Sequence, residues 1–174
     1  LQAKAKETFD NRNTKINDLR TKQDAFRTAQ YEKLRTLAKN DTQKQAVENF
    51  IATVNSALGA KNAEVDAAME IYRASVFDLH RTRSNIVNGA INNYRGSANT
   101  VLTTAKVQCD NNEDPEFIKS SLKRDLKQAQ DSMKTALKVL EDYKGTNKGF
   151  IQDLKSRTSQ ATDKFKITVQ AARE

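Results

Sequence analysis

A pattern that repeats every 22 residues constrains the fold of this chain more than any other feature. Residues 47–54, 69–76 and 91–98 have similar residue types at most of their eight positions, with Phe50, Tyr72 and Tyr94 at the equivalent position. Twenty-two residues make about six turns of an α-helix, so equivalent side chains return to nearly the same helix face. The repeat therefore predicts a long helix with one apolar stripe.

The composition suits helices that each bury a single stripe. Hydrophobic residues make up 37% of the 174 residues and aromatic residues 6%, and there is no Trp. This content is low for a thick globular core but sufficient for striped helices. The chain has one Pro and five Gly, and it lacks the β-branched and aromatic runs that favour strands. We therefore predict an all-α fold in a single domain that spans residues 1–174.

Interruptions in the apolar pattern divide the chain into three or four helices. The predicted helices span residues 2–39, 42–109, 115–144 and 147–172. Short loops would fold them into an elongated antiparallel helical bundle or coiled coil around one very long central helix. The central helix could break near Gly59, because Gly often follows the last turn of a helix. The 22-residue phase passes through Gly59 unchanged, which favours a continuous helix.

The first helix has its apolar residues at spacings of three, four or multiples of these, which fit one helix face. They are Phe9, Ile16, Leu19, Phe26, Leu34 and Leu37. Two loops carry capping signals. Thr42 and Gln45 have the spacing of a capping box, and Asp114 followed by Pro115 suits the N-cap and first position of the third helix.

The net charge of +8 arises from 30 basic and 22 acidic residues that are mixed along the chain. Mixed charges usually cover solvated helix surfaces through pairs three or four residues apart. Tyr72-Arg73 and Tyr94-Arg95 each place an aromatic residue beside a basic one, as in proteins that bind single-stranded nucleic acid. The tyrosines fall on the apolar stripe, so we prefer core tyrosines with boundary arginines. Arg73 and Arg95 stay candidate contacts to an anionic partner.

No group of residues indicates catalysis. The chain has no phosphate-binding Gly-rich loop, nucleophile elbow or dinucleotide fingerprint. His80 is the single histidine and has no partner at metal-ligand spacing. The acidic residues between 110 and 116 lack the spacing of a calcium-binding EF-hand loop, so we assign them to capping. We predict that the protein is not an enzyme and has no catalytic residue, cofactor or metal.

Three features of the sequence bear on the cellular compartment of the protein. Cys109 is the single cysteine, so it can form an intermolecular disulfide but no internal one, and only if the protein is exported. No apolar run approaches the roughly 20 residues that cross a bilayer. The chain begins at Leu1 rather than Met. We therefore expect a processed or partial form, and a leader or membrane anchor ahead of it would lie outside this sequence.

Three stretches stand out beside the repeat, namely residues 71–76, the Tyr94-Arg95 pair and residues 109–118. Together they resemble a loosely defined group of uncharacterised, exported, alanine-rich helical proteins from small-genome candidate-phyla bacteria. The resemblance covers roughly residues 45–140. It implies an envelope or extracellular location and no known activity, and no functional residue is carried over from it.

Three functions are open at this point. We favour a non-enzymatic structural or interaction protein, exported or associated with the cell envelope, that acts as a helical spacer or as a bundle that binds a protein, either itself or another. The first alternative is a basic bundle that binds an anionic membrane surface or, less readily, nucleic acid. The second is the extracellular sensory or ligand-binding bundle of a membrane protein. No small-molecule substrate is indicated, and a cytoplasmic location stays open.

Overall fold

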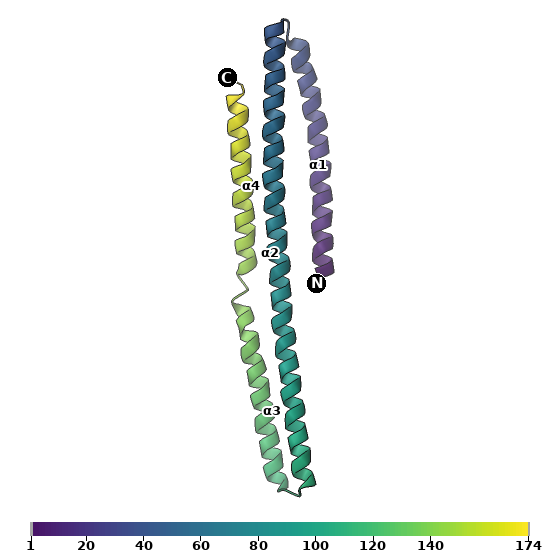
Figure 1. The fold of residues 1–174 in the computed structure, drawn as a ribbon, viewed down its shortest axis with the longest axis vertical. Helices are drawn as coiled ribbons and strands as arrows, with labels where there is room; N and C mark the ends of the chain where they lie inside the picture. Colours follow the sequence, from purple (N-terminus) through teal and green to yellow (C-terminus); the bar gives the residue numbers. More distant parts are fainter. Residues whose placement is uncertain (1, 174) are drawn as a thin grey trace. The chain divides into compact units, whose positions relative to one another are not determined.

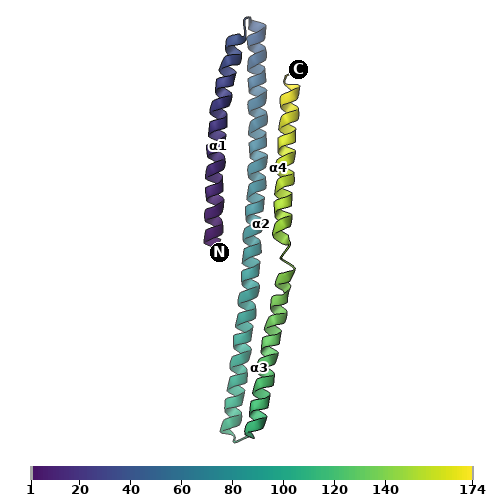
Figure 2. The ribbon, with the colours of Figure 1, turned by 180° about the vertical axis from the view of Figure 1, so that it is seen from behind.

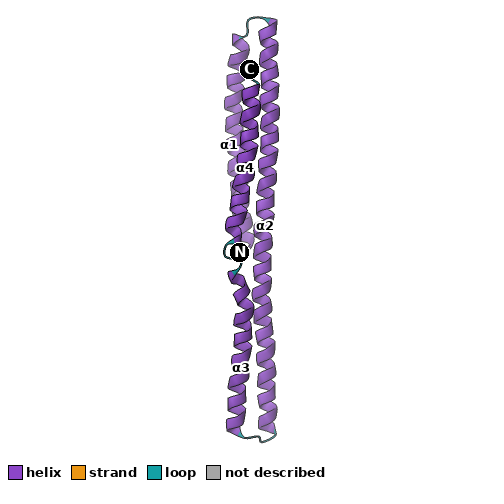
Figure 3. Cartoon of the chain, turned by 90° about the vertical axis from the view of Figure 1, so that its left-hand side faces the viewer, coloured by secondary structure: helices purple, strands orange, loops and turns teal. Residues whose placement is uncertain are grey.

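The computed structural model describes the backbone of residues 2–173 and the side chains in that range apart from residues 2, 3 and 5. Every regular element among these residues is helical (Figure 3). The elements are α1 (Gln2–Leu37), α2 (Asp41–Asp110), α3 (Pro115–Lys138), the short 3₁₀ turn η1 (Val139–Glu141) and α4 (Thr146–Ala171). The predicted all-α fold with one very long helix is confirmed.

α2 passes through Gly59 without a break. Its buried side chains recur at spacings of three, four or sums of these, so they lie along one stripe. Ala68 and Ala90 are each only 3% exposed. The other buried hydrophobic residues of α2 are Ile51, Val54, Val76 and Leu79.

The chain divides into two compact units, which are described separately. Unit 1 comprises Leu1–Ser75 and Gly149–Glu174 and therefore contains α1, the first part of α2 and most of α4. Within it, α1 and α4 run antiparallel to α2 (Figures 1 and 2), and in the side view both lie over the same side of α2 (Figure 3). Its core centres on Tyr31, Ile51 and Val54. The half-buried residues packed against this core are Val47, Phe50, Phe165 and Val169.

Further contacts set the register of the helices in unit 1. Phe9 of α1 meets Tyr72 of α2 edge to face, with ring centroids 5.8 Å apart and an interplanar angle of 66°; aromatic rings favour this geometry. Between α2 and α4, Lys164 donates to both carboxylate oxygens of Glu64 at 2.9 and 3.1 Å. Lys61 lies over the Phe165 ring, 5.4 Å from its centroid.

Unit 2 comprises Val76–Lys148. In it, the whole of α3 packs antiparallel against the last part of α2 as a helical hairpin (Figure 1). α3 begins as predicted. Pro115 occupies its first turn, and the side chain of the N-cap residue Asp114 accepts a hydrogen bond of 3.3 Å from the Glu116 N–H. The residues of α3 that are buried in the hairpin are Ile118, Ser121 and Ala129.

The cap of α2 differs from the prediction. The Asn40 Oδ1 accepts from the Gln43 N–H at 2.8 Å, and the Gln43 Oε1 accepts from the Lys39 N–H at 2.8 Å. Asn40 is therefore the N-cap residue, two residues before Thr42, and the Gln43 side chain reaches one residue further back than in a standard capping box. Asparagine caps a helix at least as well as threonine, so the earlier residue takes the position.

The end of α3 also differs, because the helix stops at Lys138 rather than at residue 144. The following residues form hydrogen bonds three residues apart: Asp142 N–H to Val139 O at 3.2 Å and Lys144 N–H to Glu141 O at 3.1 Å. Such bonds tighten the backbone into 3₁₀ geometry, which is common at helix ends. The other observed helix ends lie within two residues of the predicted ones.

Candidate interaction surface

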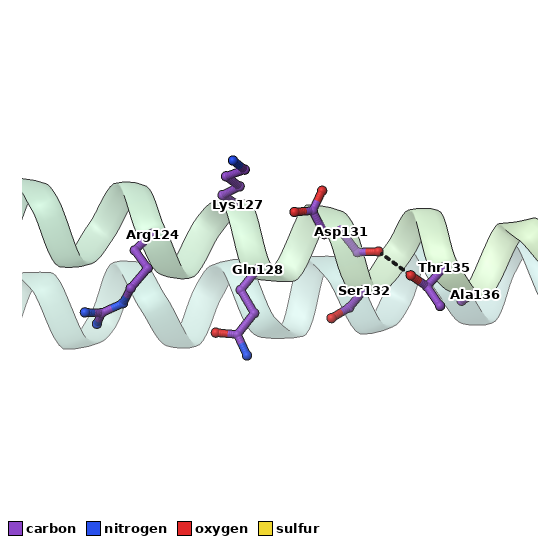
Figure 4. Close-up of a pocket in the computed structure, with 7 residues that line it drawn as sticks. All are labelled: Arg124, Lys127, Gln128, Asp131, Ser132, Thr135 and Ala136. Carbon is purple, nitrogen blue, oxygen red and sulfur yellow. Dashed lines mark hydrogen bonds between the residues drawn. The ribbon is translucent and has the colours of Figure 1, made fainter.

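An open hollow of about 690 Å³ lies along α3 in unit 2. Figure 4 shows Lys127 and Asp131 pointing to one side of the helix and Gln128 and Ser132 to the other. The bond drawn there runs from the Thr135 hydroxyl to the Asp131 carbonyl at 2.9 Å. The side chains diverge, whereas a ligand or catalytic site needs polar groups that converge. The full lining, all of it exposed, is Arg124, Lys127, Gln128, Asp131, Ser132, Thr135 and Ala136.

A groove of about 490 Å³ in unit 1 is lined by α1, α2 and α4 together. Its apolar residues are Ile16, Val65, Met69 and Leu154. The hydroxyls of the α4 threonines that line it, Thr158 and Thr162, donate to carbonyls of their own helix at 2.8 Å. Apart from Ser159, whose hydroxyl lies 3.5 Å from the Asp163 Oδ2, the groove lining is therefore left with apolar and charged groups. The remaining lining residues are Arg12, Lys155, Ser159, Asp163 and Lys166.

The side of α1 that borders this groove combines exposed apolar and cationic side chains. At about 100° per residue, one set of positions lies within about 60° of Leu19 around the helix. Three of its apolar members are more than half exposed, namely Leu19, Phe26 and Leu37 at 58%, 69% and 70%. The cationic members are Lys4, Arg12, Lys15, Lys22 and Lys33, and all of these are exposed. We call these eight residues the cationic face of α1.

The acidic residues of α1 lie on the other sides of the helix. All of them are about 100° or more from Leu19, and Asp18 is the nearest. The set comprises Glu7, Asp10, Asp18, Asp24 and Glu32. Positive and negative charge are therefore separated around α1 even though they are mixed along its sequence.

The ion pairs of α1 follow the same division. Each cation of α1 outside the face is paired: Lys6 with Asp10, Arg20 with Asp66, Arg27 with Asp24, and Arg35 with Glu32 and Glu48. None of the five cations of the face forms an ion pair with any side chain that the structure describes. The cationic face therefore presents charge that no described carboxylate neutralises by direct contact.

The paired side has shifted pKa values that reflect these contacts. The Asp66 hydrogen bond raises the pKa of Arg20 above its ordinary value, against the opposing effect of burial. The hydrogen bonds that Arg35 donates to Glu48 and to Glu32 raise the pKa of Arg35. The hydrogen bond from Lys6 lowers the pKa of Asp10. In each of these contacts a described carboxylate already neutralises the cation, which the cations of the cationic face lack.

The sequence-predicted contact residues lie elsewhere. Arg73 is half-buried, and its Nη1 is 3.5 Å from the Glu70 Oε1. Arg95 is exposed and belongs to unit 2, whereas Arg73 belongs to unit 1. Cys109 is exposed near the end of α2, which leaves the intermolecular disulfide a prediction.

Sequence reasoning missed the cationic face for two reasons. It counted charge along the chain, where the signs alternate, rather than around a helix. It also assigned the apolar residues of α1 to one face. The structure divides this set, because Phe9 is buried at 9% exposure while Leu19 and Phe26 are exposed. Projecting the charges at the helical period would have revealed the surface.

Comparison with known proteins finds no significant similarity to any family model, curated protein or solved structure. Across residues 2–173, no helix combines the length and the apolar character needed to cross a membrane. In the same part of the chain, no three His, Cys, Asp or Glu side chains gather as they would around a metal ion.

Proposed function

We propose that the chain is a non-enzymatic structural and interaction protein, a helical bundle that meets its partner along the exposed side of a helix. The single observation that carries this proposal is the exposure of Leu19, Phe26 and Leu37, each at least 58%, on one face of α1. Removing apolar surface from water is favourable by about 25 cal/mol per Å². A partner on this face would gain that stabilisation. The resemblance to exported helical proteins supports an envelope or extracellular setting.

The charges of the same face favour an anionic partner. Five cations without described counter-ions attract negative charge and repel a like-charged surface. A second copy docked through the same face would bring two such sets together, which disfavours a symmetric dimer there. The partner class that we propose is therefore an acidic surface rather than another copy of this chain.

Salt-dependent elution from a sulfonate cation exchanger tests this proposal. One variant combines Lys15→Gln, Lys22→Gln and Lys33→Gln. The matched control combines Lys106→Gln, Lys123→Gln and Lys127→Gln, which are exposed lysines of unit 2 that also lack an ion pair among the described residues. Each triple removes three charges from the net +8, and glutamine keeps a helix propensity close to that of lysine.

We expect the α1 triple to elute at clearly lower salt than the control triple, because adsorption to an anionic matrix uses the five unpaired cations that share one face of α1. Circular dichroism should show equal helicity for both variants. Equal elution of the two triples would contradict the proposal, because the unit 2 lysines would then bind the anionic matrix as well as the face does.

A further inference from the structure

The partner of the cationic face can be specified further, an inference that rests on the proposed function. We propose that α1 docks on an anionic lipid surface, with Leu19 and Phe26 inserted among the lipids and the neighbouring lysines against the headgroups. The ligand class is a bilayer that carries acidic phospholipids. The association is peripheral, since α1 lies along the surface of the bilayer.

The spacing of the apolar side chains favours lipid over a folded protein. Leu19 and Phe26 are about 10 Å apart along the helix at 1.5 Å per residue, and Phe26 and Leu37 are about 16 Å apart. Cationic residues at positions 22 and 33 stand between them. The core of a protein interface instead groups aromatic and apolar residues and is depleted in lysine. Lipids can rearrange around isolated side chains, and lysine stems can lie along apolar surface with the amine in the headgroup layer.

The charge separation of α1 orients this docking. With Leu19 toward the bilayer, the cations of the face lie within about 60° of the contact direction and the acidic residues lie about 100° or more away. The paired residue Arg20 lies on the side of α1 that contacts α2, so binding leaves the Arg20–Asp66 contact intact. Three exposed apolar residues are too few for stable anchoring, so the binding is reversible and depends on salt.

Nucleic acid is the other anionic partner that the cations could meet. A phosphate backbone attracts lysine and arginine but offers no apolar surface at the positions of Leu19 and Phe26. An acidic amphipathic helix of a partner protein would contact both the cationic and the apolar side chains of the face. Substituting the apolar residues separates lipid from nucleic acid, and a direct peptide probe separates lipid from protein.

Co-sedimentation with vesicles tests the inference on the complete chain. The probe is phosphatidylcholine with about one third phosphatidylglycerol, and pure phosphatidylcholine is the reference, each at about 50 mM and about 300 mM salt. The apolar variant is Leu19→Ser with Phe26→Ser. Its matched control is Leu102→Ser with Val107→Ser, two side chains of unit 2 that are 53% and 52% exposed. The lysine triples described above are included.

We expect binding to the anionic vesicles at low salt, at least about tenfold weaker binding at high salt, and none to pure phosphatidylcholine. The apolar variant and the α1 lysine triple should each bind about tenfold more weakly, and their matched controls should bind as the unsubstituted chain does. Equal losses in the Leu19/Phe26 variant and in the Leu102/Val107 variant would overturn the assignment to α1.

Two further probes decide between partner classes. Binding of duplex DNA that is unchanged in the Leu19/Phe26 variant, without binding to vesicles, would overturn the lipid inference. So would binding of an acidic amphipathic peptide without binding to vesicles. In either case the proposed function survives, provided that the lysine triples still separate on the cation exchanger. Equal elution of those triples would reject the proposed function itself.

Discussion

Arg20 of α1 and Asp66 of α2 form a bidentate ion pair, with Nη1 3.0 Å from Oδ2 and Nη2 2.8 Å from Oδ1. Two parallel hydrogen bonds fix direction as well as distance, which a single lysine contact does not. Farther along the same pair of helices, Arg35 donates to both carboxylate oxygens of Glu48 at 2.7 and 3.0 Å. Together these contacts hold α1 in one register and rotation against α2, which turns the cationic face away from that helix.

Removing the Arg20–Asp66 pair should weaken unit 1 modestly. We expect Asp66→Asn to lower the free energy of unfolding by about 0.5–1 kcal/mol, since the Asp66 side chain is 57% exposed and exposed pairs contribute little. Urea unfolding followed by circular dichroism measures the change. Asp78→Asn is the control, because its partner Arg81 lies only three residues away on the same helix. A loss in the control as large as in Asp66→Asn would contradict a register role.

The Arg35–Glu48 pair should make stability depend on acid pH. The hydrogen bond from Arg35 lowers the pKa of Glu48 below its ordinary value of 4.5. A lowered folded-state pKa gives stability that is fully present above 4.5 and is lost as the pH falls through the folded-state value. We expect Arg35→Gln to raise the Glu48 pKa toward 4.5 in an NMR titration of its carboxyl carbon. Superimposable Glu48 titration curves for the unsubstituted chain and the Arg35→Gln variant would show that Arg35 does not lower the Glu48 pKa.

Two isoleucines offer a matched comparison of buried and exposed positions in unit 1. Ile51 is 6% exposed in the core with Tyr31 and Val54, whereas Ile167 of α4 is 69% exposed. We expect Ile51→Ala to lower the free energy of unfolding by about 2–4 kcal/mol because it leaves a cavity. Ile167→Ala should cost under about 0.5 kcal/mol. The measurement is urea unfolding, and similar losses would show that the core lies elsewhere.

The N-terminus of α3 should depend on its cap. We expect Asp114→Ala to destabilise the first turn of α3 by about 1 kcal/mol, because the Glu116 N–H loses its side-chain acceptor. Amide hydrogen exchange over residues 116–118 reports this locally. Asp114→Asn keeps an acceptor and should exchange nearly as the unsubstituted chain does. Fast amide exchange in the asparagine variant would contradict this, because the negative charge of Asp114 rather than its hydrogen bond would then stabilise the first turn.

The sequence predicted those parts of the fold that depend on residues close together along the chain. The stripe of α2 predicted a long helix, and Asp114 with Pro115 predicted the start of α3, because both depend on neighbours along the chain. The exposure of Phe26 was not predictable in this way. Helical spacing shows which side chains share a face, but only tertiary contact decides which face a neighbour covers. In unit 1, α2 covers the side of α1 that carries Phe9 and Tyr31 and leaves Phe26 open.

Site-directed spin labelling tests most directly whether α1 meets its partner through the cationic face. Nitroxides are attached to Gln23→Cys, which lies between Leu19 and Phe26 on that face, and to Thr28→Cys on the opposite side, each combined with Cys109→Ser. On adding vesicles with about one third phosphatidylglycerol, the label at 23 should lose collisions with a water-soluble nickel chelate and gain collisions with oxygen. The label at 28 should keep its aqueous collisions. Equal changes at the two positions, or no change at 23, would contradict the account.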